Sequence, residues 1–309
     1  MKFSHYSVML EECMDGLSVK KGGTYFDGTL GGGGHSEAIL KRLDGEGFLF
    51  STDLDDDAIL SATERLSKFS NFKAVKSNFK NFKAVADELG IDCIDGAILD
   101  LGVSSYQLDN RERGFSYMSR ETRLDMRMDR SSGFSAYEVV NGYDEKKLKF
   151  IISCYGEEKF AGNIAKNIVE TRKIKPIETT GELVDICDRS IPYKFKRDTH
   201  PAKKTFQAIR IEVNGELSGL DTVLKDIVDR LKKGGRLAVI TFHSLEDRIV
   251  KTIFKELSQG CDCDKRYPCV CGKKEIVREV NKKPIVASDN ELSANSRSKS
   301  AKLRVVEKL

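Results

Sequence analysis

The sequence has no long apolar run. Its longest runs, such as residues 237–242, fall far short of the roughly 18 residues that a membrane span needs. Residues 1–12 also lack the basic, then apolar, then small-residue order of a signal peptide. We therefore expect a soluble, cytoplasmic protein that does not engage a membrane. With 309 residues and 39% apolar content, the chain is long enough for two domains, or for one large domain with an insertion.

Three common signatures of phosphate binding or hydrolysis are also missing. A dinucleotide fingerprint, Gly-x-Gly-x-x-Gly, fails because its sixth position counted from Gly31 is Ser36, and its third position counted from Gly28 is Leu30. No Gly-Lys-Ser/Thr ending of a Walker loop is present, and the His-Ser pair at 243–244 lacks the Gly-x-Ser-x-Gly elbow of a serine hydrolase. The glycine-rich loop at 28–34 therefore indicates a cofactor without a pyrophosphate.

The order of predicted elements indicates an α/β fold with an insertion. Strand-like runs alternate with helical patterns, which predicts a mostly parallel sheet with helices on both faces. The strand-like runs cover residues 24–27, 47–53, 72–75, 94–100 and 236–242. The helical patterns beside them cover residues 37–43, 58–66, 82–89, 204–214 and 220–232.

Between these elements, an Arg-rich stretch at 110–130 is typical of a long loop, and residues 135–193 have helical patterns with no strand. We predict a Rossmann-like domain formed by residues 1–105 and 200–309, into which residues 106–199 insert as a loop and helical domain for substrate recognition.

Acidic residues close several of the predicted strands. Asp27 ends the first strand before the glycine loop, Asp53 ends the second and Asp100 ends the fourth. Glycines let a backbone approach a ligand closely, and carboxylates suit both the ribose hydroxyls and the cationic amine of S-adenosylmethionine. The ligand crevice of a parallel α/β sheet lies at this edge. Phe79, just after the third strand, either joins the core or stacks on the adenine.

Positive charge gathers near the end of the chain. Residues 248–309 contain 15 Lys and Arg against 8 Asp and Glu, a net charge of +7, whereas the whole chain has only +4. This segment is either a phosphate-contacting surface or a solvated tail. Residues 301–306, which alternate apolar and basic side chains, are also consistent with an exposed edge strand.

Four cysteines lie close together in the sequence, at Cys261, Cys263, Cys269 and Cys271. In a cytosolic chain such a cluster indicates a metal site before it indicates disulfides. The spacing is Cys-x-Cys twice, however, whereas zinc knuckles usually have Cys-x-x-Cys. A zinc site and a cysteine-rich surface loop both remain open.

Nine stretches, spread from His5 to Arg304, together resemble one family. They are residues 5–10 (HYSVML), 27–36 (DGTLGGGGHS), 100–105 (DLGVSS), 113–117 (RGFSY), 124–129 (LDMRMD), 200–207 (HPAKKTFQ), 210–214 (RIEVN), 242–248 (FHSLEDR) and 296–304 (SRSKSAKLR). In this order they resemble the RsmH (MraW) family of bacterial ribosomal RNA methyltransferases. The resemblance implies a class I methyltransferase fold and N4-methylation of a cytidine in the decoding region of 16S rRNA, within the small ribosomal subunit.

The resemblance also implies which residues contact S-adenosylmethionine. Carried over position by position, these are Gly33, Gly34, His35, Asp53, Phe79, Asp100 and Gln107. At the position of Gln107, relatives often have His. Glutamine keeps a hydrogen-bond donor and an acceptor but loses the titratable ring.

The cytosine amine is a poor nucleophile, and many amino-methyltransferases polarise it with an Asp/Asn-Pro-Pro-aromatic loop after the fourth strand. Residues 100–105 differ from that pattern, so Asp100 and Ser104 are the candidate catalytic groups. Phe115, Tyr117 and Phe242 are either core residues or the walls of a pocket for a flipped base. The predicted RNA contacts are Arg127, Lys203, Lys204, Arg210, His243, Arg297, Lys299 and Arg304.

Two other interpretations remain. A small-molecule methyltransferase would use the insertion as a lid over a closed pocket, and a non-catalytic RNA-binding assembly factor would keep only the fold. The basic tail and the Arg-rich loop favour RNA over a small substrate, and the set of Asp27, Asp53 and Asp100 around the glycine loop favours an intact cofactor site. The oligomeric state is not predicted.

Overall fold

A computed structural model describes residues 7–196, 200–261, 263, 266 and 271–309. Its contacts divide the chain into two compact units. The sheet unit comprises Met1–Gly102 and Ser218–Leu309, and the helical unit comprises Val103–Leu217.

The sheet unit contains seven strands in the order β3-β2-β1-β4-β5-β7-β6. Their bounds are β1 Thr24–Asp27, β2 Phe48–Asp53, β3 Phe72–Lys76, β4 Ile94–Asp100, β5 Leu231–Thr241, β6 Val277–Glu279 and β7 Lys302–Lys308. The first five strands pair in parallel, and β7 runs antiparallel to both of its neighbours. The predicted mostly parallel α/β fold is confirmed. The suggestion that residues 301–306 form a strand is confirmed by β7, but its predicted position at the edge of the sheet is wrong, because β7 lies between β5 and β6.

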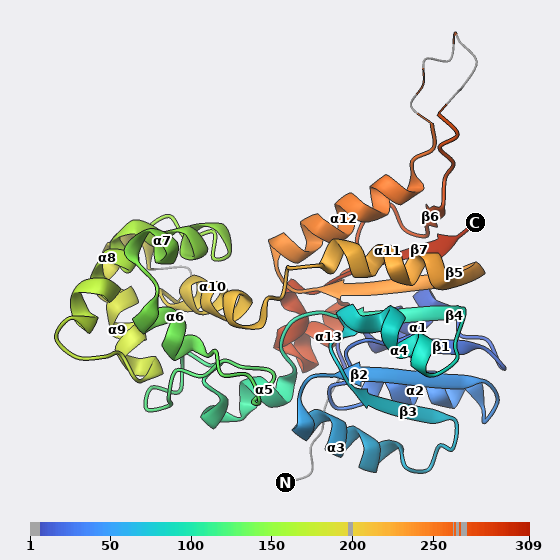
Figure 1. The fold of residues 1–309 in the computed structure, drawn as a ribbon, viewed down its shortest axis with the longest axis horizontal. Coiled ribbons are helices and arrows are strands. Elements are labelled where there is room, and N and C mark those ends of the chain that lie inside the picture. The colour runs from blue at the N-terminus through green and yellow to red at the C-terminus, as the bar shows by residue number, and fades with distance from the viewer. Residues whose placement is uncertain (1–6, 197–199, 262, 264–265, 267–270) are drawn as a thin grey trace. The chain divides into compact units, whose positions relative to one another are not determined.

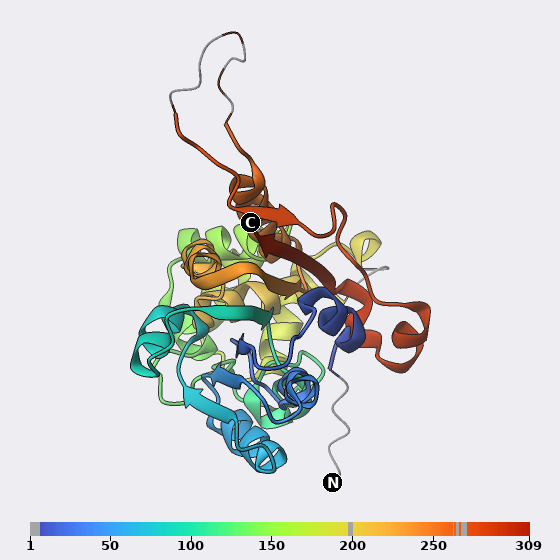
Figure 2. The ribbon, with the colours of Figure 1, turned by 90° about the vertical axis from the view of Figure 1, so that its right-hand side faces the viewer.

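Helices cover both faces of this sheet (Figures 1 and 2). They are α1 Leu10–Leu17, α2 Gly34–Leu43, α3 Asp56–Leu66, η1 Phe79–Asn81, α4 Phe82–Glu88, α11 Leu220–Arg230, α12 Ser244–Ser258, α13 Asp289–Ala294 and η4 Ser296–Ser300.

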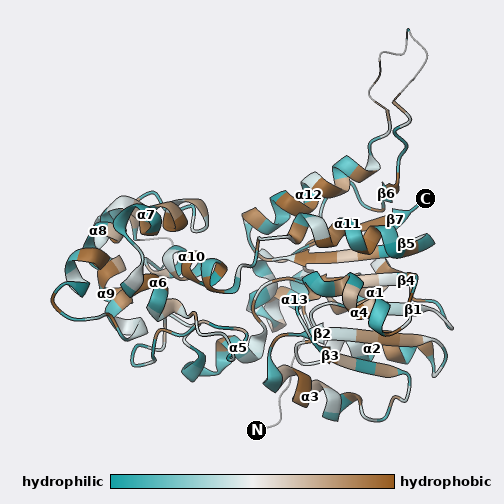
Figure 3. Ribbon diagram, viewed as in Figure 1, coloured by the Kyte–Doolittle hydropathy of each residue, from teal (hydrophilic) through white to brown (hydrophobic). Residues whose placement is uncertain are grey.

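Side chains that alternate along a strand enter two different cores. In β5, Leu237 and Val239 pack with α4, α11 and α12, whereas Ala238 and Ile240 pack with α1 and α2 on the other face. Because both faces are buried, the strand carries a continuous apolar run, visible in brown in Figure 3.

The helical unit has a core of its own. Its helices are α5 Ser105–Asp109, η2 Arg111–Arg113, α6 Ala136–Gly142, α7 Glu145–Cys154, α8 Ala161–Arg172, α9 Thr180–Ser190, η3 Tyr193–Phe195 and α10 Lys203–Asn214. Capping boxes start α6 at Ser135 and α9 at Thr179, where a Glu three residues later bonds back to the cap. The predicted series of helices is confirmed, and the Arg-rich stretch is largely a loop that contains the single turn of η2.

The boundary of the helical unit differs from the predicted one. We expected residues 200–309 to join the sheet, but α10 packs against α6 and α7, and its buried residues Phe206 and Ile209 belong to the helical core. At the other boundary, Ser104 and Ser105 also fall in the helical unit. Helical periodicity shows that a helix buries one face but does not show which core that face joins.

Among the residues that the structure describes, no helix is long and apolar enough to cross a membrane.

Candidate active site

Three acidic strand ends meet at one edge of the sheet. Asp27, Asp53 and Asp100 are the last residues of β1, β2 and β4, and all three strands are parallel. The strand order reverses between the neighbouring strands β1 and β4, because β2 and β3 lie on one side of β1 and β5 lies on the far side of β4. Open α/β sheets bind ligands at such a reversal.

Asp27 accepts hydrogen bonds from residues at both ends of the glycine loop. Its side chain is 1% exposed, and its two oxygens accept hydrogen bonds from the Thr29 N–H at 3.1 Å and the Ser36 hydroxyl at 2.7 Å. Burial raises the pKa of this carboxyl. Asp27 therefore fixes the two ends of the loop to β1, which is a positioning role, and its oxygens are already occupied within the protein.

The glycines of the loop allow close packing against neighbouring segments. A Cβ at Gly28 would lie 2.3 Å from Leu99 Cδ2 and 2.9 Å from Phe79 Cβ. A Cβ at Gly34 would lie 1.8 Å from the Ser7 hydroxyl, and Gly33, at φ 75°, adopts a left-handed conformation that disfavours a side chain. Helix α2 begins at Gly34, so the first amide groups of its N-terminus have no acceptor within the helix.

Asp53 binds the other side of the loop. Its oxygens accept hydrogen bonds from the Gly31 N–H at 2.8 Å and the Asp55 N–H at 2.9 Å. Burial raises the pKa of Asp53 to about 6, so the carboxylate form predominates at neutral pH. Phe79, in η1 just after β3, is partly buried and packs against the sheet core, which agrees with the first of its two predicted roles and leaves stacking on the adenine a prediction.

His35 and Asp100 face each other at the end of β4. The ring Nε2 of His35 lies 3.1 Å from the Val8 carbonyl, and burial lowers the pKa of this histidine to about 4. The neutral ring therefore donates its proton to Val8, which leaves the lone pair on Nδ1. That nitrogen lies 3.8 Å from Asp100 Oδ2.

Asp100 is the most perturbed carboxyl of this edge. Burial, together with the charges of Asp27, Glu246 and Glu291, raises its pKa to about 8. Its backbone N–H bonds to the Thr29 hydroxyl at 2.7 Å, which ties β4 to the loop. Its buried Oδ1 has no hydrogen-bond partner in the described part of the chain. A buried polar atom without a partner is uncommon in proteins, and at this edge of the sheet a bound ligand is one group that would supply a partner.

Ser104 and Gln107, two further predicted site residues, hold a helix end. Ser104 is the N-cap of α5, its hydroxyl accepts from the Gln107 N–H at 3.2 Å, and the Gln107 side chain accepts from the Ser104 N–H at 3.1 Å. Both residues lie in the helical unit, and this capping box accounts for their spacing.

Several predicted RNA contacts are engaged within the protein, so their charge is already paired. Arg127 makes a two-point ion pair with Asp125, and Arg210 makes one with Glu216. Arg304 lies in β7 with its side chain 11% exposed, at 2.7 Å from an Asp247 oxygen. Whether these three arginines also contact phosphates stays a prediction, but each of them already has a carboxylate partner within the protein.

The remaining predicted contacts divide between buried and exposed positions. His243 is the N-cap of α12, where its ring accepts a hydrogen bond from the Glu246 N–H, and its Nε2 is buried without a hydrogen-bond partner in the described part of the chain. Lys204 donates to the Glu157 carbonyl at 3.0 Å. Lys203 and Lys299 are exposed, and Arg297, in η4, is half-buried.

The three aromatic residues predicted to flank a flipped base have different surroundings. Phe115 is 6% exposed and belongs to the core of the helical unit. Tyr117 stacks on His200 in the same unit, with ring centroids 4.4 Å apart. Phe242 packs on the core of the sheet unit.

One basic surface lies within the predicted basic segment 248–309, but its residues were not among the predicted RNA contacts. Arg248, Lys251 and Lys255 lie on α12 and line a shallow depression together with Thr252, Glu256 and Gln259. Spacings of three and four residues place side chains on one helix face, so the pattern was present in the sequence. The charge count over the whole C-terminal segment did not separate these three residues from the other basic residues.

The residues at the sheet edge fit a cationic cofactor that carries no phosphate. Three carboxyls with raised pKa values, those of Asp27, Asp53 and Asp100, lie around the loop, and a buried oxygen of Asp100 has no partner among the residues that the structure describes. S-adenosylmethionine, with a sulfonium, an ammonium and a ribose diol, is the cofactor that these groups fit.

The model of the MraW methylase family matches residues 2–309. Two curated relatives from Clostridium botulinum, of the Loch Maree and Kyoto strains, are each 56% identical to the chain over 310 residues and are covered in full, as is this chain. Both are named ribosomal RNA small subunit methyltransferase H. A crystal structure of a putative rRNA methylase from Clostridium thermocellum aligns over 99% of this chain and 100% of its own at 14% identity, with a TM-score of 0.44, too distant to bear on function. The full-length match to the family model and the identity to these relatives show that the chain belongs to the MraW methylase family.

Proposed function

We propose that this protein transfers a methyl group from S-adenosylmethionine to the N4 amine of a cytidine in the decoding region of 16S rRNA. Membership of a methylase family supports the reaction type, and the name of the 56% identical relatives supports small-subunit rRNA as the substrate. In this proposal the sheet unit binds the cofactor and the helical unit recognises the substrate.

The single observation that carries the proposal is the state of Asp100. A carboxyl with a pKa of about 8 and an unpartnered oxygen stands at the end of β4, beside the strand that opens into the glycine loop. A purely structural acid would be satisfied by neighbouring donors, as Asp27 is. Asp100 is instead the acid that the fold leaves available for chemistry.

The protein must hold the cofactor and keep its orientation. Asp53 is positioned for the ribose hydroxyls because the Gly31 and Asp55 amides fix the direction of its carboxylate. In this proposal the backbone of Gly33, Gly34 and His35, at the start of α2, lines the cofactor site. When bound, S-adenosylmethionine supplies an electrophilic methyl group on a sulfonium sulfur.

The chain must also manage a proton. The amine nitrogen forms a bond to the methyl carbon while the carbon–sulfur bond breaks, and the nitrogen then loses one of its protons. Asp100 in its ionised form is the acceptor that we assign, because its environment makes it a stronger base than an ordinary carboxylate. His35, whose Nε2–H donates to the Val8 carbonyl, leaves Nδ1 as an acceptor 3.8 Å from Asp100 Oδ2, so it favours the protonated form of that carboxyl over the carboxylate.

The exposed cations are the phosphate contacts in this proposal. Lys251 and Lys255 on α12, Lys203 on α10 and Lys299 on η4 all present their charge to solvent. Contacts of this kind set affinity and register on the RNA without reading its sequence.

Transfer of a labelled methyl group tests the proposal. The purified protein should label small ribosomal subunits that lack the modification, and Asp100→Asn should reduce the rate by about 10²-fold or more, the lower range for loss of a general base. If the label appeared only in small molecules, a small-molecule methyltransferase would be favoured. Binding to the subunit without any transfer would favour an assembly factor.

A further inference from the structure

The connection between α12 and β6 carries a cluster of cysteines that the proposed reaction does not use. Helix α12 ends at Ser258 and β6 begins at Val277, and between them the described chain has no helix or strand. One backbone hydrogen bond, from the Ile276 N–H to the Leu257 carbonyl at 2.9 Å, closes the base of this hairpin. Figures 1 and 2 show both arms leaving the sheet unit beyond the end of α12.

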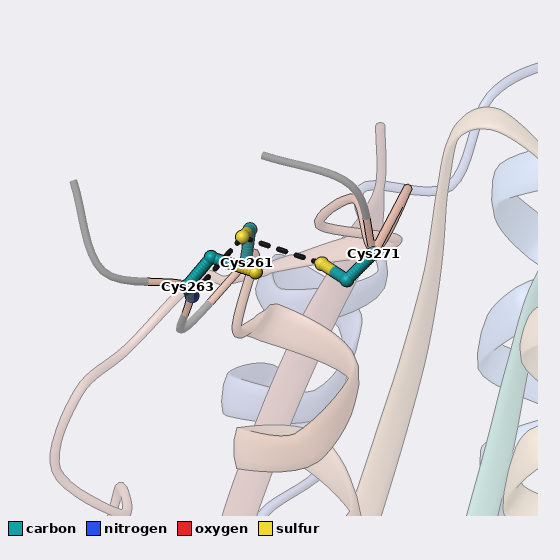
Figure 4. A group of neighbouring side chains, drawn as sticks. All are labelled: Cys261, Cys263 and Cys271. Carbon is teal, nitrogen blue, oxygen red and sulfur yellow. Dashed lines mark hydrogen bonds between the residues drawn. The ribbon is translucent and has the colours of Figure 1, made fainter. Parts of the chain in front are cut away.

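Three sulfur atoms from the two arms converge. The Sγ atoms of Cys261, Cys263 and Cys271 all lie within 4.8 Å of one another, and those of Cys261 and Cys271 are 3.3 Å apart. Figure 4 shows Cys261 and Cys271 directed toward each other across the hairpin. Sulfurs bound to one tetrahedral zinc ion, with Zn–S bonds of about 2.3 Å, are separated by about 3.8 Å. The cluster is therefore close to the size of such a site.

Backbone amide groups donate hydrogen bonds to two of the three sulfur atoms. The Cys263 N–H donates to Cys261 Sγ at 3.2 Å, and the Lys273 N–H donates to Cys271 Sγ at 3.5 Å. In both arms the donor lies two residues after the cysteine. Hydrogen bonds from amide groups stabilise a thiolate, which is the form that binds a metal.

A disulfide between Cys261 and Cys271 is the competing explanation, and it leaves part of the geometry unexplained. A disulfide uses two sulfurs, whereas a third, from Cys263, lies in the same cluster. Ile276, at the base of the hairpin, is 37% exposed, so its side chain is not buried in a core there. A metal ion would supply the link between the arms that a hydrophobic core supplies elsewhere.

We propose that Cys261, Cys263 and Cys271 bind a zinc ion that joins the two arms of the hairpin. Three thiolates favour zinc over harder cations such as magnesium or calcium. Cys269, the fourth cysteine of the sequence pattern, lies outside the described residues. The role of the ion is structural, because the 15 residues of α12 separate the cluster from the end of β5 by about 20 Å.

Metal analysis of the full chain tests this site. Protein purified without a chelator should contain about one zinc ion per chain, as expected for a site of this type. Cys261→Ser and Cys271→Ser should each lose most of it. The matched controls are Cys93→Ser and Cys154→Ser, which replace exposed cysteines outside the cluster and should keep the full metal content.

Two further measurements decide the matter if a serine variant fails to fold. Cobalt added to the reduced, metal-free wild-type protein should give the intense thiolate-to-cobalt absorption of a tetrahedral site. Chelation should make residues 259–276 the first site of proteolytic cleavage and leave the circular dichroism spectrum of the rest nearly unchanged. A wild-type protein with no bound metal and no cobalt–thiolate absorption would overturn the proposal, as would loss of two titratable thiols to a disulfide in the metal-free protein.

Discussion

In the wild type, binding of the cofactor should be coupled to release of a proton from Asp100. Replacing Asp100 with asparagine should abolish that coupling. With a pKa of about 8, the Asp100 carboxyl is protonated in roughly nine of ten ligand-free molecules at pH 7. A cationic ligand stabilises the carboxylate and therefore lowers this pKa. Binding of S-adenosylmethionine should then release a proton, and its affinity should rise with pH by at most about tenfold per pH unit before it levels off above pH 8.

Calorimetry measures this coupling directly. Titrations at pH 7 and above, each in two buffers with different heats of ionisation, give the number of protons released per cofactor bound. We expect a release that approaches one proton near pH 7 in the wild type and a much smaller release in Asp100→Asn. Asp53, with a pKa of about 6, contributes mainly below this range. The matched control is Asp92→Asn, which changes a fully exposed acid just before the same strand.

The same variant should change how stability depends on pH. The folded-state pKa of Asp100 is raised above its unfolded value of 3.8, so this residue favours folding below about pH 4 and loses that contribution as pH rises toward 8. The loss is at most about 1.4 kcal/mol per pH unit. Asp100→Asn should therefore gain stability relative to the wild type between pH 4 and pH 8 in urea unfolding. Equal pH profiles for the two proteins, in binding and in unfolding, would refute the assignment of Asp100.

Three further changes have defined outcomes. Asp53→Ala should weaken binding of S-adenosylmethionine by about 1.5–3 kcal/mol, the usual value of a hydrogen bond to a charged group, and an unchanged dissociation constant in calorimetry would exclude Asp53 from the site. Arg304→Ala should lower the free energy of unfolding by a similar amount, because it breaks a largely buried pair with Asp247, and should leave the salt dependence of RNA binding unaltered. Charge reversal of Lys251 and Lys255 should leave the melting temperature nearly constant. It should reduce the slope of log affinity against log salt by about 0.7–0.9 for each phosphate that the variant no longer neutralises. An unchanged slope would exclude α12 from the RNA interface.

The centre of the sheet was predictable because β4 and β5 are buried on both faces. The continuous apolar runs of β4 and β5 are typical of central strands, and an acid at the end of a parallel strand necessarily lies at the ligand edge. Asp53 and Asp100 could be selected for that reason. The role of Asp27 could not, because the Ser36 hydroxyl that occupies its oxygen atom becomes a neighbour only when the loop has folded.

The residues proposed to contact RNA were less predictable, because the pairing of each charge depends on tertiary structure. Asp247, the partner of Arg304, is 57 residues away in the sequence, and nothing in the local pattern joins them. The partners of Arg127 and Arg210 are only two and six residues away, yet charge counting treats each of these arginines as available. The role of His243 had a signal, because a Glu three residues later is the pattern of a capping box.

The nucleoside that receives the methyl group tests the central claim most directly. Small ribosomal subunits that lack the modification would be incubated with the protein and isotopically labelled S-adenosylmethionine, and their 16S rRNA digested and analysed by mass spectrometry. We predict that the label appears in N4-methylcytidine from the decoding region, and that it appears at a rate lower by about 10²-fold or more when Asp100→Asn replaces the wild type. Label in any other nucleoside, or rRNA without label in the presence of active, cofactor-binding protein, would contradict the account.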